Sequence, residues 1–254
     1  MKISIITVVW NNINTINDTI NSVLSQNYNN IEYIVIDGGS TDGTLSLLKS
    51  RSDQLSVLIS EPDKGIYDAM NKGIKLARGD VIGFLNSDDF YFNDEVIKKI
   101  AKEFAKDPFL EASYADLIYV DKTNTSKIIR YFKSSKFKQG LFLKGWCPPH
   151  PTFFVRKSVY ERYGNFNLNY NLASDVDLMM RFLEKYKIKS HYTSEIWVKM
   201  RMGGVSNKNL KNIWTQNKEI LNSIYKNGLK VNPISFFIHK IISRLQQYIK
   251  KKIL

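Results

Sequence analysis

The first hundred residues alternate short apolar runs with segments of helical periodicity, and this alternation restricts the possible folds more than any other feature. The apolar runs have the length of buried strands and lie at residues 3–9, 31–36, 55–59 and 81–85. The helical segments lie at residues 15–26, 45–48 and 66–77. Strands and helices that alternate at this spacing predict an α/β fold, with a parallel sheet covered by helices on both faces.

Beyond residue 110 the pattern is less regular. It predicts strands near residues 112–120, 127–131, 152–155 and 191–202. Apolar residues at helical spacing after Ser174 predict a helix that begins there. A chain of 254 residues accommodates one domain, or one domain with an extension.

Charge is distributed unevenly along the chain, which carries a net +13. Residues 205–254 contain ten basic residues and one acidic residue, a net +9, which leaves +4 for the first 204 residues.

One cysteine, Cys147, excludes a disulfide scaffold and a cysteine-rich zinc module, and it suits a reducing compartment. No apolar run approaches the roughly 20 residues of a spanning helix, and residues 3–10 are interpreted as a strand rather than a signal segment. A cytoplasmic protein is therefore expected.

Acidic residues follow two of the predicted strands. Asp37 comes directly after the second strand, and Asp88 and Asp89 follow the fourth. Ligands of α/β sheets bind outside the carboxyl ends of the strands, so these carboxylates are candidates for a ligand or metal site. Mg²⁺ and Mn²⁺ prefer such oxygen ligands. The alternative is an ordinary turn that caps the next helix.

Other polar residues allow more than one interpretation. The loop that begins at Asp37 could contact a nucleobase or ribose, or could simply form a tight turn, and it matches neither phosphate-binding glycine motif. Asp175 and Asp177 begin a helix, where a carboxylate serves either as a cap or as a general base. Each of four further residues could be a structural group, a ligand, or a cation that neutralises a diphosphate. No role is assigned to them: His150, Arg181, Lys199 and Arg201.

An ordered set of motifs over about residues 1–206 closely resembles family 2 glycosyltransferases. The set comprises residues 7–12, 33–44, 61–74, 77–80, 84–89, 150–154, 173–178 and 203–206. Each motif is weak alone, but their order and spacing are specific. The resemblance implies the GT-A fold, in which a Rossmann-like nucleotide-binding half and an acceptor-binding half share one mixed central sheet. We therefore expect a GT-A domain at residues 1–204 and a basic helical extension at residues 205–254.

The resemblance also implies an inverting hexosyl- or N-acetylhexosaminyltransferase. The donor would be a nucleoside-diphosphate sugar, most often UDP-linked, and the acceptor a glycan or lipid-linked hydroxyl in cell-surface polysaccharide synthesis. Asp37 would contact the nucleobase, Val8 and Trp10 would flank it, and Asp63 and Lys64 would line the nucleotide pocket.

The remaining assignments from the resemblance concern the metal and the base. Asn86-Ser87-Asp88 matches the family's DXD motif, with Asn86 toward the ribose and Asp88 as the ligand of Mn²⁺ or Mg²⁺. Asparagine at the first position departs from the commoner aspartate and brings no charge. Asp175 matches the catalytic base, although Ser174 replaces the usual glutamate, which leaves Asp177 as a competing candidate.

The C-terminal residues 233–254 form an amphipathic pattern with a basic face. Such a helix either lies on an anionic membrane surface, at the inner face of the cell membrane, or packs on this domain or another subunit.

Three other functions stay open: a nucleotidyltransferase, a non-catalytic nucleotide-sugar binder, and a basic nucleic-acid-binding protein. The last is disfavoured because the positive charge is confined to one tail and no nucleic-acid motif occurs, so no nucleic-acid partner is expected.

Overall fold

The computed structural model describes residues 1–203 and 209–249. Three residues of the last motif, Gly204, Val205 and Ser206, lie outside the described residues, as do Lys208 and the basic residues 250–252. The boundary expected after residue 204 falls in the same gap, so it stays a prediction.

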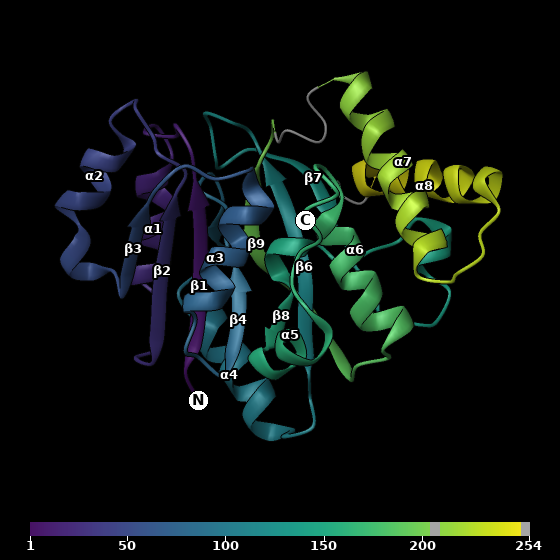
Figure 1. Cartoon of the computed structure of the whole chain (residues 1–254), viewed down its shortest axis with the longest axis horizontal. Helices are drawn as coiled ribbons and strands as arrows, with labels where there is room; N and C mark the ends of the chain where they lie inside the picture. Colours follow the sequence, from purple (N-terminus) through teal and green to yellow (C-terminus); the bar gives the residue numbers. More distant parts are fainter. Residues whose placement is uncertain (204–208, 250–254) are drawn as a thin grey trace.

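One mixed sheet runs through the molecule, with the strand order β3-β2-β1-β4-β8-β6-β9-β5 and with β7 paired to β6 (Figure 1). The strands are β1 (Ile3–Val9), β2 (Ile31–Asp37), β3 (Val57–Ser60), β4 (Val81–Phe84), β5 (Phe90–Tyr91), β6 (Ala112–Val120), β7 (Ile128–Phe132), β8 (Phe154–Arg156) and β9 (Ser190–Arg201). The first four pair in parallel, as the sequence predicted. β8 pairs antiparallel to both β4 and β6, which joins the parallel half to the second half.

Helices cover both faces of this sheet. They are α1 (Ile16–Leu24), α2 (Thr44–Ser50), α3 (Ile66–Leu76), α4 (Val96–Lys106), α5 (Lys157–Tyr163), α6 (Ser174–Met180), α7 (Leu210–Lys226) and α8 (Pro233–Ile249). A π-helical turn, Arg181–Lys185, continues α6. The α/β class and the mixed-sheet architecture that the resemblance implied are thus confirmed.

Successive residues of β1 point into two different cores, because side chains alternate across a strand. Ile6 and Val8 belong to the core beneath α3, α5 and α6, whereas Ile5 and Val9 belong to the core beneath α1 and α4. All seven residues of β1 are buried. Burial on both faces explains why apolar residues occupy both faces of the first strand instead of alternating with exposed polar ones.

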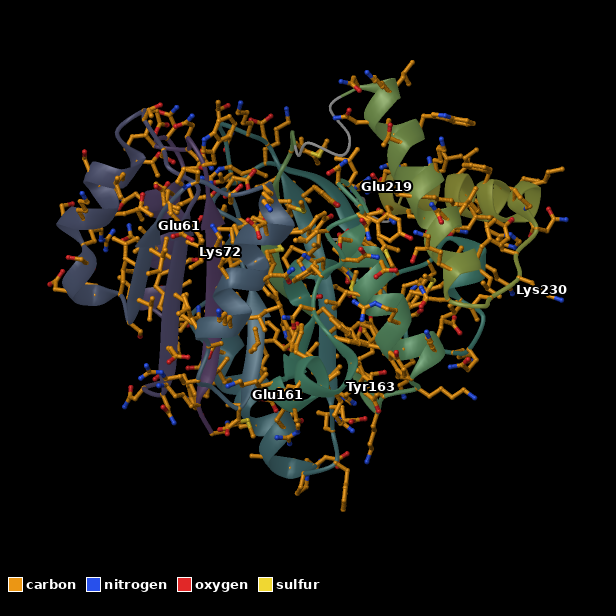
Figure 2. All side chains as sticks on the ribbon, viewed as in Figure 1. Glu61, Lys72, Glu161, Tyr163, Glu219 and Lys230 are labelled. Atoms are coloured by element: carbon orange, nitrogen blue, oxygen red, sulfur yellow. The ribbon has the colours of Figure 1, made fainter. Side chains whose placement is uncertain are left out.

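The two C-terminal helices pack against the sheet domain at its second half (Figure 1). Ile220 and Ile224 of α7 and Phe236 of α8 are buried in the same core as α3 and α6. Glu219 on α7, labelled in Figure 2, accepts hydrogen bonds from the backbone N–H groups of Asn171 and Leu172 at 3.1 and 2.8 Å. Among the residues that the structure describes, every helix is too short or too polar to cross a bilayer.

The junction between β4 and β8 generates a stability prediction. An ideal Cβ on Gly83 of β4 would lie 2.1 Å from Cε1 of Phe154, a fully buried ring on β8. We expect Gly83→Ala to lower the free energy of unfolding by about 1–3 kcal/mol, because the core must deform to admit the methyl group. Thermal and denaturant unfolding measure the change.

The double variant Gly83→Ala, Phe154→Leu serves as the control. Since the smaller side chain relieves the clash, the double variant should lose less stability than the two single losses added together. Strict additivity would contradict the steric explanation.

Candidate functional site

Asp37 lies at the carboxyl end of β2 and is fully buried. Its Oδ2 accepts hydrogen bonds from the Ser40 backbone N–H at 3.1 Å and from the Ser60 hydroxyl at 2.6 Å. Its Oδ1 has no hydrogen-bond partner in the part of the chain that the structure describes. A buried carboxylate oxygen without a partner costs free energy, so a ligand N–H group directed at Oδ1 would be stabilising.

Trp10 and Asp63 both lie close to Gly38, the glycine that follows Asp37. A Cβ on Gly38 would be 2.5 Å from Oδ2 of Asp63 and 3.5 Å from Cδ1 of Trp10. The Trp10 ring is 68% exposed, which is unusual for a tryptophan and leaves its face open to a planar ligand. Lys64, beside Asp63, is exposed. Val8, in contrast, is buried in the core, so its side chain offers no open face.

The polar cluster after β4 is held by hydrogen bonds to the loop that follows β1. Asn12 donates from Nδ2 to the Ser87 hydroxyl at 2.9 Å. Asn86 donates from Nδ2 to Oδ2 of Asp89 at 3.0 Å. The Asp88 backbone carbonyl accepts a hydrogen bond from Arg201 at 2.8 Å. These contacts fix the backbone of the cluster beside β1, at the same edge of the sheet as Asp37.

Burial and proximity raise the pKa values of two neighbouring carboxyls in this cluster. Burial raises the pKa of Asp88, although the nearby Arg201 opposes the rise. Burial raises the pKa of Asp89 well above its usual range, and the charge of Asp88 raises it further. A cation bound beside these two carboxyls would favour the ionised form of both.

The residues of this cluster fit a divalent cation that is shared with a ligand. Asp89 is fully buried and accepts hydrogen bonds from Asn86 and from the Arg201 backbone, whereas Asp88 is partly exposed. Among the described residues, no group of three or more His, Cys, Asp or Glu side chains converges as a metal site. A cation here would therefore take one protein carboxylate, from Asp88, and complete its shell with ligand and water oxygens.

Asp175, at the start of α6, is held by a tyrosine from a distant part of the sequence. The Tyr67 hydroxyl on α3 donates to Oδ1 of Asp175 at 3.0 Å. The Tyr67 ring is buried and stacks on Phe166, with ring centroids 5.5 Å apart. Burial raises the pKa of Tyr67, and the Asp175 charge raises it further, so the phenol stays protonated and donates.

The competing candidate Asp177 has a different environment. It is buried, and its Oδ2 accepts from Nε of Arg181 at 2.9 Å. Its Oδ1 accepts from the Ser223 hydroxyl on α7. Asp177 therefore connects α6 to α7, and Arg181 is committed to that contact rather than to a ligand. Asp175 and Asp177 are two residues apart on a helix, so their side chains point to nearly opposite sides.

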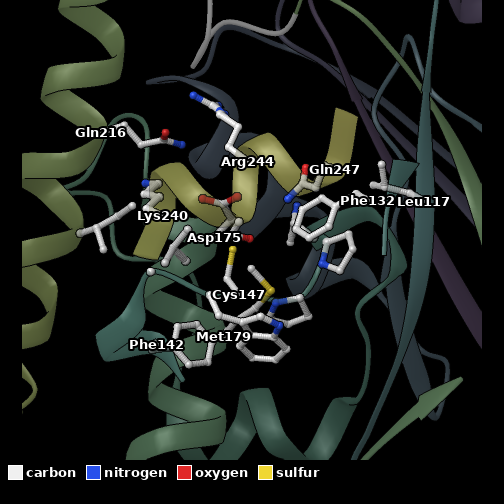
Figure 3. A pocket seen from close by; sticks show the side chains of 18 of the residues that line it. Leu117, Phe132, Phe142, Cys147, Asp175, Met179, Gln216, Lys240, Arg244 and Gln247 are labelled. Atoms are coloured by element: carbon white, nitrogen blue, oxygen red, sulfur yellow. The ribbon is translucent and has the colours of Figure 1, made fainter. Parts of the chain in front are cut away.

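A cavity of about 210 Å³ contains Asp175 at its centre (Figure 3). One wall comes from the strands and the loop 145–151, and the opposite wall from the C-terminal helices. The chief lining residues are Tyr119, Arg130, Trp146, Cys147, His150, Met179, Gln216, Lys240, Arg244 and Gln247. The cavity approaches the cluster after β4, because Met200 lines the cavity and the next residue, Arg201, donates to the Asp88 carbonyl.

His150 and Cys147 are neutral groups in this cavity. The His150 ring lies between Phe84 and Phe166, at centroid distances of 5.6 and 5.7 Å. Burial lowers the pKa of His150, although Asp175 opposes the shift. Burial raises the pKa of the Cys147 thiol to about 12. Neither environment favours a charged catalytic group at neutral pH.

The sequence-predicted residues therefore fall into two adjoining groups. Asp37, Trp10 and Asp63 gather at the end of β2, and Asn86, Ser87 and Asp88 gather at the end of β4. Asp175 lies in the adjoining cavity. Of the three cations without an assigned role, Arg201 contacts the β4 cluster, whereas Arg181 pairs with Asp177 and Lys199 lies over Phe90 and Phe92.

Four side chains of this region were not predicted from the sequence: Tyr67, Arg130, Lys240 and Gln216. Tyr67 is within a motif that the resemblance used, but the sequence gives no sign of its contact 108 residues away. Lys240 belongs to the amphipathic tail, which was expected to lie on a membrane or to pack on this domain or another subunit. In the structure Lys240 lies on the cavity wall.

A family model described as "Glycosyl transferase family 2" matches residues 4–164 of this chain. A protein named "PGL/p-HBAD biosynthesis glycosyltransferase" from Mycobacterium tuberculosis is 28% identical over 192 residues, which cover 74% of this chain and 72% of that protein. An uncharacterized glycosyltransferase of the same species is 32% identical over 185 residues, 70% of this chain and 68% of the relative.

Two solved structures illustrate the shared fold. Residues 1–349 of S. aureus TarS, in complex with UDP-GlcNAc, align with a TM-score of 0.65 at 17% identity over 94% of this chain and 70% of that one. A mannosyltransferase from Pyrobaculum calidifontis, in complex with GDP-Man and Mn²⁺, aligns with a TM-score of 0.66 at 17% identity. The alignment covers 97% of this chain and 69% of that one. The chain spans only 41% of a longer TarS structure.

The contrast between Asp175 and Asp177 generates a prediction about stability. We expect Asp177→Asn to lower the free energy of unfolding by about 3 kcal/mol, because Arg181 loses the partner of a buried ion pair. Asp175→Asn keeps an oxygen that accepts from Tyr67, so its loss should stay below about 1 kcal/mol. Chemical denaturation of both variants measures the difference, and equal losses would contradict a separation of the two roles.

Proposed function

The chain belongs to glycosyl transferase family 2, and from this premise we propose that it transfers a hexosyl or N-acetylhexosaminyl group from a UDP-linked donor, with inversion, to an acceptor hydroxyl. The observation that carries the proposal is spatial: two acidic clusters at the carboxyl edge of the parallel strands adjoin a cavity that contains a third carboxylate. Family membership also sets aside the nucleotidyltransferase that the sequence left open.

The uridine part of the donor would bind at the end of β2. Oδ1 of Asp37 is a buried acceptor without a partner among the described residues, which suits the N–H of a uracil ring. The exposed face of Trp10 offers a stacking surface, and Asp63 and Lys64 would line the remainder of the nucleotide pocket.

The diphosphate of the donor would bind at the end of β4, with Asp88 holding Mn²⁺ or Mg²⁺. When bound, the cation would stabilise negative charge on the departing diphosphate. The chain's own contribution is the fixed position of Asp88, since its backbone carbonyl is held by Arg201 and the cluster is tied to the β1 loop through Asn12 and Ser87. Asn86 would donate a hydrogen bond to the ribose or accept one from it.

Asp175 would act as the general base. It takes the proton from the acceptor hydroxyl as the oxygen attacks the anomeric carbon, and a single displacement from the opposite face gives inversion. The hydrogen bond from Tyr67 orients Oδ1 of Asp175, which leaves Oδ2 for the acceptor. The cavity beside Asp175 would hold the acceptor, a glycan or a lipid-linked saccharide of cell-surface polysaccharide synthesis.

The outer surface of α8 supports attachment to a membrane. Five large apolar residues are exposed on it, each between 48% and 72%: Ile234, Ile238, Ile241, Ile242 and Leu245. Exposed lysines on α7 and the following loop add positive charge, and the lone acidic residue of this segment, Glu219, is engaged with backbone N–H groups. An exposed apolar face in a segment with exposed lysines suits an anionic lipid surface, at the inner face of the cell membrane.

Asp175→Asn tests the general base. We expect the variant to bind UDP as the wild type does, and to lose about 10²–10⁴-fold in sugar transfer, because the amide cannot take a proton. Donor turnover is measured with a panel of nucleotide sugars, with Mn²⁺ present. A variant that turns over at the wild-type rate would overturn the assignment. A wild type that binds UDP-sugars without turnover would instead be a non-catalytic binder.

Asp88→Ala tests the metal site. We expect Mn²⁺ to strengthen UDP binding to the wild type by at least about tenfold and to have little effect on the variant, since the variant lacks the protein carboxylate of the site. Calorimetric titration with and without EDTA measures both affinities. Asn86→Ala is the matched control and should keep the metal response. An Mn²⁺ response that persists in Asp88→Ala would refute the site.

Cosedimentation with vesicles tests the membrane proposal. We expect the full chain to bind vesicles that contain phosphatidylglycerol, and the variant Ile241→Glu, Leu245→Glu to bind at least about tenfold more weakly, because it places charge in the apolar face. Phe109→Glu is the matched control, since Phe109 is 78% exposed elsewhere on the molecule. Equal binding by all three proteins would exclude α8 as the attachment surface.

A further inference from the structure

The segment between β4 and β5 turns away from the sheet, and side chains from other elements bind its backbone carbonyl groups. β4 ends at Phe84 and β5 begins at Phe90, so residues 86–89 lie between the two strands. A turn hydrogen bond joins the Asp89 N–H to the Asn86 carbonyl at 3.0 Å. Carbonyl groups that leave a strand need other donors when they are buried. The donors at this segment come from α1 and from the end of β9.

Two threonines at the start of α1 face this segment. The Thr19 hydroxyl is fully buried and donates to the Asp89 carbonyl at 2.7 Å. The Thr15 hydroxyl lies 3.0 Å from the Ser87 carbonyl oxygen, to which it can donate. Because Thr15 and Thr19 are four residues apart, their side chains lie on the same face of the helix. α1 thus presents hydroxyl groups to the backbone of the cluster.

The carbonyl between these two, that of Asp88, is bound by Arg201 at the end of β9. Nη1 of Arg201 donates to this carbonyl at 2.8 Å, and Nη2 donates to Oδ2 of Asp18 on α1. Arg201 is 7% exposed, and its guanidinium carbon lies 5.0 Å from the centroid of the Phe90 ring. Asp18 and Arg201 are 183 positions apart in the sequence. Their contact therefore joins the two halves of the fold directly beside Asp88.

Asp18 also balances the charge of Arg201. A guanidinium is charged at any ordinary pH, and a positive charge beside a divalent cation weakens the binding of that cation. The Asp18 carboxylate forms an ion pair with Arg201. Arg201 can therefore hold the Asp88 backbone without leaving an uncompensated positive charge beside the cation.

We propose that Asp18, Thr19 and Arg201 are positioning residues of the metal site. They fix the backbone at Asp88 and Asp89, and thereby direct the Asp88 carboxylate toward the cation. This inference rests on the proposed function, because it concerns the cation that Asp88 would hold together with the donor diphosphate. The three residues would act through Asp88 and not as ligands of the cation.

The direction of the Asp88 carboxylate is critical because Asp88 is the one carboxylate assigned to the cation. Asn86 occupies the position where an aspartate is commoner, and it brings no charge. A misdirected Asp88 would therefore have no second carboxylate to compensate for it. Groups that orient a metal ligand typically contribute about 10–100-fold to metal affinity. The planar fork of an arginine also reaches two acceptors in a fixed geometry, which a lysine at position 201 would not do.

UDP titrations at increasing Mn²⁺ concentration test the positioning role. The readout is the Mn²⁺ concentration that gives half of the gain in UDP affinity, measured by calorimetry. We expect Asp18→Ala and Arg201→Met each to raise this concentration at least about tenfold. Both variants should bind UDP in EDTA as the wild type does. Asp18 is 55% exposed, so Asp18→Ala is expected to fold.

Asp107→Ala is the matched control. Asp107 forms an ion pair with Lys189, which directly precedes β9, whereas Arg201 ends that strand. The control thus removes an aspartate from an ion pair at the opposite end of the same strand. We expect its Mn²⁺ response to equal that of the wild type.

The double variant Asp18→Ala, Arg201→Met tests whether Asp18 acts through Arg201. If it does, Asp18→Ala should change the Mn²⁺ response less than about threefold once Arg201 is absent. The sign of the Arg201→Met effect separates positioning from charge. Removal of a positive charge beside a cation strengthens cation binding by Coulomb's law, whereas loss of the donor to the Asp88 carbonyl weakens it.

Thr19→Val and Thr19→Ser form a second pair of variants. Valine removes the hydroxyl that binds the Asp89 carbonyl, whereas serine keeps it. We expect Thr19→Val to raise the half-effect Mn²⁺ concentration about tenfold, and Thr19→Ser to stay within about threefold of the wild type. Denaturant unfolding of both variants shows whether they are folded. If Thr19→Val does not fold, Asp18→Ala and Thr19→Ser still decide the outcome.

Each other outcome overturns the positioning role. Weaker UDP binding by Arg201→Met in EDTA would make Arg201 a direct ligand of the diphosphate. A stronger Mn²⁺ response in Arg201→Met would make its effect purely electrostatic. An equal loss in Asp107→Ala would reduce the effect to the general loss of an ion pair. Failure of the proposed metal site is distinct, because Mn²⁺ would then leave the UDP affinity of the wild type unchanged.

Discussion

Burial of carboxylates at one edge of the sheet is the constraint on which the rest of the site depends. Asp37 is fully buried, and one of its carboxylate oxygens has no partner among the described residues. Burial raises the pKa values of Asp88 and Asp89, and the charge of Asp88 raises that of Asp89 further. A lone chain holds such groups at a cost in free energy. Under the proposed function, a nucleobase N–H and a diphosphate-bound cation would remove that cost, so stability and donor binding are coupled at the same residues.

The parallel half of the fold could be predicted from the sequence because its signals are local. Residues 3–9 form β1 as expected, and β2 and β4 are mostly apolar because both of their faces are buried. Helix α4 was not predicted, although Val96, Ile97, Ile100 and Phe104 recur at helical spacing. Helix α7 lies in a stretch with many polar residues. The antiparallel pairing through β8 depends on contacts between distant segments, which periodicity does not reveal.

The candidate site likewise has a part that the sequence predicts and a part that it does not. Asp37 and Asp88 follow buried strands, so the topology alone brings them to one edge. Whether Asp175 or Asp177 faces the cavity depends on which side of α6 meets α7, and this follows from tertiary packing rather than from the motif. Tyr67 and Lys240 belong to the site through interactions with residues that are more than sixty positions away in the sequence. Their positions could therefore be seen only in three dimensions.

The wall that α8 contributes comes from a part of the chain beyond residue 164, where the family match ends. The groups proposed for the donor and those proposed for the far side of the acceptor are therefore encoded in separate stretches of sequence. Substitutions in α8 can reshape one compartment while the hydrogen bonds of Asp37 and the β4 cluster stay as they are. A catalyst organised in this way can diversify its products by exchanging its C-terminal segment, with the sugar-activating chemistry left undisturbed.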